Sequence, residues 1–469
     1  MPSLVWFRRD LRVRDNTALY YAAKESQVVG LFVVTPKQWK EHHDAPVKVN
    51  FLMESLQCLS AELESLNIPL LIRTCSSFAQ TPRLVLKVAK EFGCTKLFFN
   101  GEYEVNESLR DSQTVAALSK AGIESDSYHD RIIVPPENIS TKDGRFYSVF
   151  TPYRRVWDTK ALEHAKVLPK PKKQTPLDIE SDPVPVSVKG FDFSDVRSDL
   201  WPAGEAEAKR RLKKFGTRID GYTDWRDIPS AVGTSLLSPF LAAGVISPRQ
   251  CLAAVIKHNG GTLKGSEGPV TWVSELTWRD FYTHVMVGFP QVSRHRPFKA
   301  KTEGVPWRYD KADFAAWCEG RTGYPIVDAG MRQLNQTGWM HNRMRMVTAM
   351  FLTKNLLIDW RWGEKYFMQN LVDGDLAANN GGWQWSASTG TDSVPYFRIF
   401  NPFSQSKRFD KEGKYIKMFC PELEPIPAKV FHDEKKFAAA IQENGVEYPS
   451  YVVNCKLGRE RALQAFKSL

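Results

Sequence analysis

The sequence has no hydrophobic run of the ~18 residues that a membrane-spanning helix needs, so we expect no membrane span. The apolar stretch at residues 4–7 is followed at once by Arg8, Arg9 and Asp10, and it is too short for a signal peptide. The seven cysteines are an odd number and form no Cys-x-x-Cys pair. A disulfide framework or a zinc ribbon is therefore not expected, and a cytoplasmic location is the natural one.

Sequence motifs of several common enzyme classes are also missing. Neither G-x-G-x-x-G nor G-x-x-x-x-G-K-[ST] follows a predicted strand, which argues against a dinucleotide-binding dehydrogenase and a P-loop NTPase. The nine histidines form no H-E-x-x-H motif and no cluster with cysteine, so no metal site is predicted. The G-x-S-x-G motif is absent too, and serine hydrolase chemistry has no support.

The composition that is present is that of a globular protein with a basic surface. Hydrophobic residues make up 42% and charged residues 25% of 469 residues, enough for two or three domains. The net charge of +11 suits a polyanionic partner such as nucleic acid, although a merely basic protein would show the same excess. Eleven of the 14 tryptophans lie between Trp201 and Trp385, so the second half of the chain needs large flat rings.

Short apolar runs alternate with helical periodicity along the first 130 residues. The predicted strands are residues 3–7, 28–34, 69–73 and 95–100, and the predicted helices are residues 16–24, 47–66, 83–92 and 105–120. This alternation is typical of a doubly wound parallel sheet and predicts an α/β domain over residues 1–130. Such sheets bind ligands beyond the carboxyl ends of their strands, but the pattern does not say which ligand.

The composition changes after this region. Residues 131–200 are interpreted as an interdomain linker, because from residue 168 they are rich in proline and lysine and have little apolar periodicity. Residues 201–469 are predicted to form an all-α domain. The predicted helices in it are residues 205–214, 248–257, 271–289, 311–319, 326–334, 339–355 and 362–370.

One helix places aromatic and charged residues on the same face. Trp272, Glu275 and Arg279 recur at intervals of three and four residues, and Trp278 lies beside them. A buried charge needs a partner, so this stripe is a poor core pattern and favours a ligand-binding face. The alternative is an exposed Glu275–Arg279 ion pair, worth a few tenths of a kcal/mol.

A second helix, around residues 339–346, combines an amide, a thioether and guanidinium groups. Asn342 and Met346 lie one turn apart, with Arg343 and Arg345 beside them. These groups suit a flat heterocycle and nearby phosphates. The alternative, a basic amphipathic helix with core methionines, is favoured when the segment is taken alone.

Two further segments are rich in turn-forming or hydroxyl residues. Residues 373–385 contain Asp-Gly-Asp and Asn-Asn-Gly-Gly, and we interpret them as a tight turn around something close to the backbone. Residues 234–238 supply hydroxyl groups directly before a predicted helix, where N–H groups favour phosphate. Ordinary capping and turn formation is the alternative for both segments.

Taken together, these segments closely resemble the DNA photolyase/cryptochrome family. The resemblance rests on VWFRRDLRVRDN at residues 5–16, on TGYPIVDAGMR at residues 322–332, and on residues 339–346 and 373–385. It extends from residue 4 to about residue 420. The pair His341-Asn342 and the following Met346 are most similar to bacterial class I cyclobutane pyrimidine dimer photolyases, since (6-4) enzymes and animal cryptochromes carry His-His.

The resemblance implies non-covalent FAD in the helical domain and light-driven splitting of pyrimidine dimers. The implied FAD contacts are Tyr222, Thr234, Ser235, Leu236, Leu237, Ser238, Trp272, Glu275, Arg279, Asn342, Arg345, Asp373, Asp375 and Asn379. Several relatives carry arginine where this chain has Leu236, so only main-chain contacts are expected there. Arg345 would supply positive charge to the reduced ring, Asp373 would orient it, and Asn379 would face N5 of the flavin.

The family also implies a pocket for a dimer that has been flipped out of the helix. Trp278 and Trp385 would form its two walls, and stacking of ~1–3 kcal/mol per base would offset the cost of extrusion. Glu275 and Asn342 would hydrogen-bond the pyrimidine edges, and Met346 would complete the apolar side. The candidates for holding the DNA strand are Arg226, Trp278, Asn342, Arg343, Gln405 and Lys407.

Two further functions follow from the resemblance. Trp307, Trp360 and Trp383 match the tryptophans that carry electrons to oxidised flavin. His42, Asn106, Glu107 and Arg294 match an antenna site, with methenyltetrahydrofolate as the expected chromophore and a deazaflavin as the alternative. A monomer is expected. The alternative functions are a blue-light photoreceptor that binds FAD without repair, and a DNA-binding module without flavin.

Overall fold

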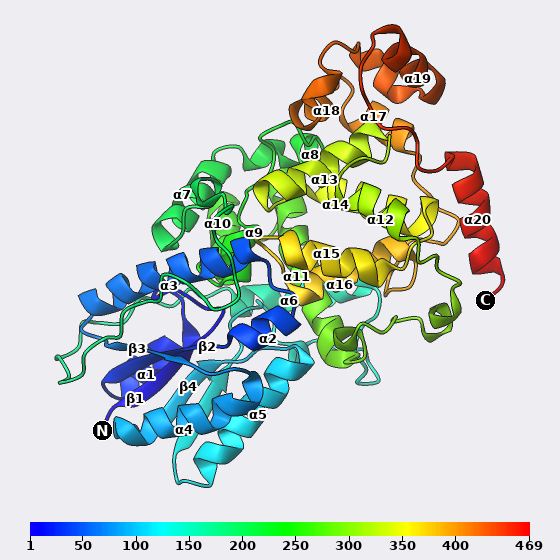
Figure 1. Cartoon of the computed structure of the whole chain (residues 1–469). Helices are drawn as coiled ribbons and strands as arrows, with labels where there is room; N and C mark the ends of the chain where they lie inside the picture. The colour runs from blue at the N-terminus through cyan, green and yellow to red at the C-terminus, as the bar shows by residue number, and fades with distance from the viewer. The chain divides into compact units, whose positions relative to one another are not determined.

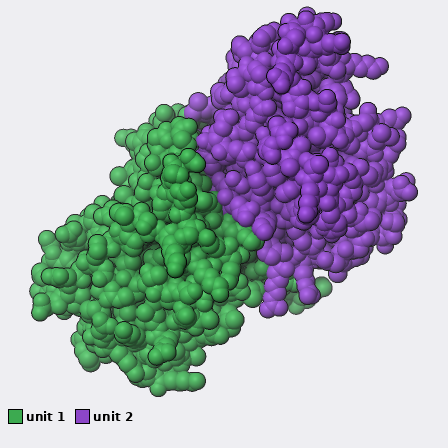
Figure 2. Space-filling view, viewed as in Figure 1, with its two compact units in different colours: residues 1–220, 235–293, 372–377 green, residues 221–234, 294–371, 378–469 purple.

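The computed structural model describes residues 1–469 and divides into two compact units. Unit 1 comprises residues 1–220, 235–293 and 372–377, and unit 2 comprises residues 221–234, 294–371 and 378–469 (Figure 2). These units cross the domain ranges expected from composition, because residues 235–293 and 372–377 pack with the N-terminal part of the chain. The ranges 1–130, 131–200 and 201–469 stay predictions.

Unit 1 is built on a parallel sheet with the strand order β3-β2-β1-β4-β5. Its strands are β1 (Ser3–Phe7), β2 (Val28–Val34), β3 (Leu70–Thr74), β4 (Lys96–Asn100) and β5 (Glu124–Tyr128). The doubly wound α/β fold predicted from strand–helix alternation is confirmed. Strand β5 was not predicted, because its sequence is Glu-Ser-Asp-Ser-Tyr and it lies at a solvated edge where no apolar run is needed.

Helices cover both faces of the sheet. The helices between strands are α1 (Thr17–Glu25), α2 (Pro36–Glu41), α3 (Pro46–Ser65), α4 (Thr81–Glu91) and α5 (Val105–Ser119). Helices α4 and α5 lie side by side (Figure 1) and pack over the face that carries Leu4, Trp6 and Leu97. Right-handed crossovers place α1 and α3 on the opposite face.

The segment expected to be a linker is only partly irregular. It contains α6 (Phe150–His164), and residues 174–182 run along the outer edge of β3. Leu70 N donates to Ser181 Oγ at 3.0 Å, and Ile72 N donates to Asp182 Oδ2 at 2.7 Å. This segment therefore satisfies backbone groups that an edge strand would otherwise expose.

The rest of unit 1 is helical. Its remaining helices are α7 (Glu205–Gly216), α9 (Ser238–Ala242), α10 (Pro248–His258) and α11 (Glu267–Gly288). Helix α10 begins with a capping box between Ser247 and Gln250. No helix in the protein is both long and apolar enough to cross a membrane.

Unit 2 is an assembly of helices around one large apolar core, as predicted. Its helices are α8 (Tyr222–Trp225), α12 (Lys311–Cys318), α13 (Pro325–Thr337), α14 (Asn342–Met350), α15 (Trp360–Asn370), α16 (Leu376–Ala387), α17 (Pro402–Phe409), α18 (Lys414–Phe419), α19 (Glu434–Glu443) and α20 (Cys455–Lys467). Short 3-10 turns connect elements at Phe78–Gln80, Pro136–Asn138, Ser198–Leu200, Ile219–Gly221, Val292–Arg294, Ala300–Gly304, Pro421–Leu423 and Ala428–His432. The core centres on buried side chains such as Trp317, Tyr324 and Trp383.

Two local predictions in this part of the chain were wrong. The tight turn expected over residues 373–385 is confined to its first residues, because α16 starts at Leu376. Its Asn-Asn-Gly-Gly sequence is held helical by tertiary contacts, among them Asn380 Nδ2 to Glu364 Oε1 at 2.8 Å. The helix expected over residues 339–355 begins only at Asn342 and ends in a π-helical turn, Phe351–Asn355.

Candidate functional site

Helix α11 carries the stripe predicted from sequence, in which Trp272 is buried against Phe215. The opposite side of the helix is anchored by a buried carboxylate. Asp280 Oδ2 accepts hydrogen bonds from Trp157 Nε1 at 2.9 Å and from Ile133 N at 2.9 Å. Burial raises the pKa of Asp280 to about 6. This anchor fixes the rotation of the helix, so that Glu275 and Trp278 keep partial exposure on the other side.

Arg279 on this helix lacks a carboxylate partner. Its guanidinium donates only to main-chain oxygens, those of Arg131 and, at 3.5 Å, of Leu241. Burial lowers the pKa of Arg279, and the nearby charges of Asp375 and Asp280 offset this effect only in part. The side chain is thus poised to receive an anion.

Asp375, another predicted ligand residue, belongs to a chain of ion pairs in unit 1. Its Oδ2 lies 2.7 Å from Arg131 Nη2, and Arg131 Nη1 lies 3.3 Å from Glu104 Oε2. Glu104 in turn pairs with Arg9 at 2.7 Å. Burial alone would raise the pKa of Glu104, but Arg9 and Arg131 outweigh it and lower the pKa. These partners fix the carboxylate of Asp375.

The hydroxyl segment predicted to meet phosphate has an unusual backbone. Leu236 has φ of +53°, a left-handed conformation that is rare for a branched side chain. Its main-chain oxygen lies 3.4 Å from Arg211 Nη1, and α9 begins two residues later. Strain of this kind persists where the surrounding structure demands a particular presentation of the backbone.

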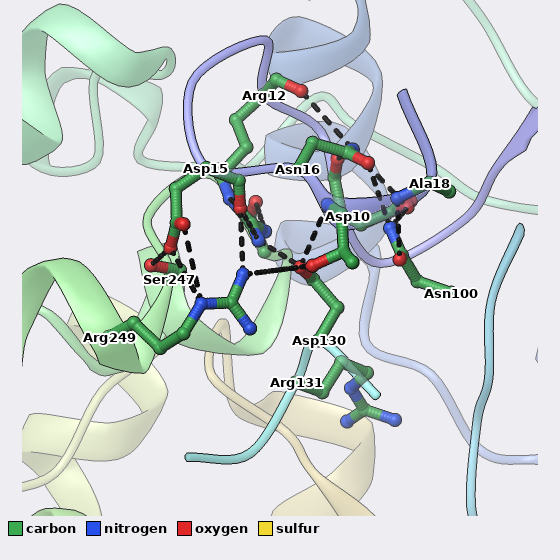
Figure 3. Close-up of polar contacts among 12 residues, drawn as sticks. Asp10, Arg12, Asp15, Asn16, Ala18, Asn100, Asp130, Arg131, Ser247 and Arg249 are labelled. Carbon is green, nitrogen blue, oxygen red and sulfur yellow. Dashed lines mark hydrogen bonds and ion pairs between the residues drawn. The ribbon is translucent and has the colours of Figure 1, made fainter. Parts of the chain in front are cut away.

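A buried ion network, which motif reasoning missed, lies at the carboxyl end of the sheet (Figure 3). Asp15 and Asp130 have no exposed surface, and Arg249 of α10 binds both, at 3.1 Å and 2.6 Å. Arg12 adds a second ion pair to Asp130, and these cations hold the pKa of Asp130 well below its usual range although burial opposes them. The conspicuous basic block at residues 5–16 therefore joins α10 to the sheet. Only the fold reveals this, because the partners are more than a hundred residues apart.

Three of the four predicted antenna residues lie together. His42 Nε2 is 3.0 Å from Asn106 Nδ2, and His42 Nδ1 is 3.4 Å from Glu107 Oε1. Burial, reinforced by Glu104, raises the pKa of Glu107 to about 8, so its carboxyl group is largely protonated at neutral pH. Arg294, the fourth residue, belongs to unit 2 and is exposed.

In unit 2, the helix predicted around residues 339–346 is α14, and it starts at the candidate ligand residue Asn342. His341 caps α14 by accepting Arg343 N at its Nδ1 atom, 3.2 Å away, and this leaves Asn342 exposed in the first turn. Arg345 Nε donates to Met340 O at 2.8 Å. Met346 is partly exposed, whereas Met340 and Met344 are buried in the core, as the alternative of core methionines expects for them.

Asn379 has a defined orientation in unit 2. Its Nδ2 donates to the main-chain oxygen of Glu364 at 2.9 Å, which leaves its Oδ1 as an acceptor. The Glu364 carboxylate accepts from Asn380 and pairs with His295 Nδ1 at 2.8 Å. Glu364 raises the pKa of His295, which has φ of +55°. Sequence reasoning included neither Glu364 nor His295 in the site.

The three tryptophans expected to carry electrons are all buried in unit 2. Trp360 and Trp383 are 1% and 2% exposed, and Trp307 is 8% exposed. The Trp383 ring contacts Phe367 edge-on, with a centroid distance of 4.9 Å. All three indoles are therefore largely shielded from solvent.

The residues predicted to contact DNA lie in unit 2, apart from Trp278 in unit 1. Arg343 pairs with Asp227 at 2.7 Å and lies over Phe409, while the Arg226 guanidinium lies over Tyr222. On α17, Lys407 is exposed and Gln405 is partly exposed. Trp385 is also partly exposed.

Comparison with known proteins gives full-length matches. Residues 3–174 match the model of the DNA photolyase family, and residues 272–468 match the FAD binding domain of DNA photolyase. The chain is 43% identical to the deoxyribodipyrimidine photo-lyase of Vibrio cholerae, covering 99% of both chains. It is 44% identical to that of Escherichia coli, covering 99% of this chain and 98% of the relative.

This chain belongs to the DNA photolyase family.

Solved structures of photolyases and cryptochromes share its fold. A bacterial class III photolyase from Agrobacterium tumefaciens aligns with a TM-score of 0.90 at 35% identity, over 100% of this chain and 97% of its own. A Synechocystis cryptochrome aligns with a TM-score of 0.87 at 28% identity, over 99% of each chain. The photolyase fold predicted from the sequence is therefore confirmed.

The residues of this photolyase family member fit FAD. Arg279 is a partly exposed cation without a carboxylate and suits a pyrophosphate. Asn379 Oδ1 is an acceptor that suits a protonated N5. The remaining predicted FAD residues are divided between the units: unit 1 holds Ser235, Leu236, Leu237, Ser238, Trp272, Glu275, Asp373 and Asp375, and unit 2 holds Tyr222, Thr234, Asn342 and Arg345.

Proposed function

We propose that this protein is a deoxyribodipyrimidine photo-lyase, a light-dependent enzyme that splits cyclobutane pyrimidine dimers in DNA. Helix α11 carries the proposal, because it combines a carboxylate, a stacking tryptophan and an uncompensated cation on one anchored face. Full-length identity of about 43% to photo-lyases supports the same conclusion.

The protein's part in catalysis is to position and to stabilise charge. FAD, when bound, supplies the electron that light drives into the dimer. Arg279 neutralises the pyrophosphate, and Asp375, fixed by Arg131, orients a polar part of the cofactor. Arg345 places positive charge near the reduced ring, with Asp373 orienting its guanidinium. Asn379 presents a neutral acceptor to N5.

The dimer is recognised by stacking and hydrogen bonds. Trp278 and Trp385 form the two aromatic walls, and both keep partial exposure. Glu275 and Asn342 hydrogen-bond the pyrimidine edges, and Met346 closes the apolar side. Excess positive charge holds the strand, which makes binding salt-sensitive. The residues proposed for that are Arg226, Arg343, Gln405 and Lys407.

Photoreduction of oxidised flavin is assigned to Trp383, Trp360 and Trp307, in that order outward. Their burial supports the assignment, since buried indoles are shielded from reductants in solvent, and Trp307, the most exposed of the three, is placed outermost. Trp307→Phe should slow photoreduction while repair by chemically pre-reduced enzyme is retained.

The antenna is proposed to be methenyltetrahydrofolate, bound by His42, Asn106, Glu107 and Arg294. The hydrogen-bonded cluster of the first three supports a polar, planar ligand. A deazaflavin is the other candidate, and the absorption spectrum of the purified protein distinguishes the two. A cytoplasmic monomer is also proposed; the seven unpaired cysteines are consistent with a reducing compartment.

One experiment tests the proposed activity. The purified protein is reduced, mixed with an oligonucleotide that contains one thymine dimer, and illuminated. Formation of the dimer lowers the absorbance of the two thymines, and we expect this absorbance to return only in the light. Flavin photoreduction without dimer repair would instead identify a blue-light receptor, and a colourless protein that binds DNA would identify a module without flavin.

A further inference from the structure

Lys354 is a lysine with no exposed surface, and no carboxylate pairs with it. It lies in the π-helical turn Phe351–Asn355 that follows α14. Its Nζ donates one hydrogen bond, to Ser388 Oγ at 2.8 Å. Ser388 has φ of +65° and directly follows α16, the helix of Trp383. A buried ammonium with so little compensation is unfavourable, and π-turns are frequent at functional sites.

One aromatic side chain lies between the Lys354 ammonium and Trp307. Lys354 Nζ lies 3.8 Å from the ring centroid of Phe466 on α20. The same ring contacts Trp307 edge-on, with centroids 6.0 Å apart and planes at 82°. Phe466 is therefore the one ring that touches both the ammonium and the indole.

The charge of Lys354 is adjustable near neutral pH. Burial, and then Lys299, lower the pKa of Lys354 to about 7. Lys299 is held by Ser393 Oγ at 2.6 Å, and Asp392 is the acidic group that faces it. Phe466 and Ser388, which contact the Lys354 ammonium, carry no group that titrates near neutral pH.

We propose that Lys354 is an electrostatic positioning residue for photoreduction, whose buried ammonium shortens the time for which Trp307 stays oxidised. The inference rests on the proposed role of Trp307 as the outermost electron donor. Lys354 is distinct from the three tryptophans, and it touches no substrate.

The electron balance gives the direction of the effect. Trp307 loses one electron through Trp360 and Trp383, the flavin gains it, and an external thiol later returns an electron to Trp307. The oxidised indole carries a positive charge until its N–H proton is lost to solvent or an electron returns. An ammonium nearby raises the energy of that charge and favours return of the electron from the flavin. A neutral amine removes this repulsion and prolongs the separated state.

The test measures the lifetime of the tryptophan radical by transient absorption, without added thiol, at pH values below and above 7. In the wild type we expect the lifetime to lengthen several-fold as pH rises. Lys354→Met removes the charge and should give the long lifetime at every pH. Lys354→Arg keeps the charge and should give the short lifetime throughout. Flavin content and thermal unfolding of each variant check that it is folded.

A second measurement needs no variant. In protein with ¹⁵N-labelled lysine, one ammonium resonance should titrate near pH 7 with the same midpoint as the radical lifetime. A wild-type lifetime that does not change with pH would overturn the proposal, as would a Lys354→Met lifetime that follows the wild type.

A separate variant tests the assignment of Trp307 as the outermost electron donor. Trp307→Phe should remove the long-lived radical. If that variant keeps the wild-type signal, Trp307 is not the outermost donor and both proposals fall; if it loses the signal while Lys354→Met follows the wild type, only the role of Lys354 falls.

Discussion

Trp278 lies parallel to Phe150, with ring centroids 3.7 Å apart and planes at 4°. Phe150 opens α6, in the segment that composition marks as a linker, so that segment supports a wall of the proposed dimer pocket. One face of the indole is covered by this contact, and a base can stack only on the other. The geometry also fixes the plane in which that base must lie.

Phe150→Leu should weaken binding of dimer-containing DNA about fivefold, because an aromatic pair of ~1 kcal/mol that fixes Trp278 is lost. Fluorescence anisotropy with a labelled oligonucleotide measures the affinity. Phe150→Tyr keeps the ring and serves as the control. Equal affinity in the leucine variant would mean that the orientation of Trp278 does not contribute to binding.

Glu275→Ala should lower light-dependent repair by roughly tenfold, since a charge-assisted hydrogen bond to the dimer is removed. The visible spectrum measures the flavin content of each variant, so that repair rates are compared at equal bound flavin. Glu275→Gln keeps an acceptor and should retain an intermediate rate. An unaltered repair yield in the alanine variant would count against the pocket assignment.

Arg279→Gln should reduce the affinity of the apoprotein for FAD by about ten- to a hundredfold, because the cation proposed for the pyrophosphate is removed. Quenching of flavin fluorescence on titration gives the dissociation constant. Arg145→Gln, which changes an exposed arginine of the same unit, is the matched control. If both variants bind FAD like the wild type, Arg279 does not hold the phosphates.

Acid should destabilise the protein through His284. Burial lowers the pKa of His284 to about 4, so between pH 6.5 and 4 the unfolded chain takes up a proton that the folded chain does not. Stability therefore falls with pH in this window, by up to about 3 kcal/mol. Urea unfolding at a series of pH values measures the slope, and His284→Gln should flatten it.

Asp280, one turn from His284 on α11, should instead stabilise the protein as the pH falls. Its pKa is raised to about 6, so below that pH the folded state gains a proton first and is stabilised relative to the unfolded chain. Asp280→Asn removes this compensation, and the loss of stability on acidification should become steeper. A slope that is unchanged in both variants would show that neither group controls the acid response.

Gly363→Ala should destabilise the protein by about 1–3 kcal/mol, because its Cβ would lie 2.1 Å from a Trp383 ring carbon. Displacement of that indole should also slow photoreduction. Gly382→Ala lies in α16, meets nothing within 4 Å, and should leave both properties intact or raise stability slightly. Chemical denaturation and photoreduction rates compare the two variants.

Much of the fold could be predicted because its elements carry their own periodicity. Strands β1 and β2 have the predicted bounds, since both are continuous apolar runs between polar segments. Strand β5 and α16 could not be predicted this way. The first is polar at a sheet edge, and the second contains Asn-Asn-Gly-Gly that only contacts with Glu364 and the core keep helical.

The candidate site was predictable in part for a similar reason. Trp272, Glu275 and Arg279 share a helix face, and spacing alone reveals that. The partners that fix the site are distant in sequence: Arg131 pairs with Asp375, and Glu364 orients Asn379. No local pattern connects such pairs, so motif matching finds the candidate ligand residues and misses the residues that hold them in place.

Residues 174–182, which run along the outer edge of β3, limit where the chain can be truncated. An isolated N-terminal fragment that ended near residue 170 would leave the amides of Leu70 and Ile72 open to a strand from another molecule. Expression of that half would then give self-associated material, even though every strand and helix were present. The smallest well-behaved N-terminal fragment must extend at least to Asp182.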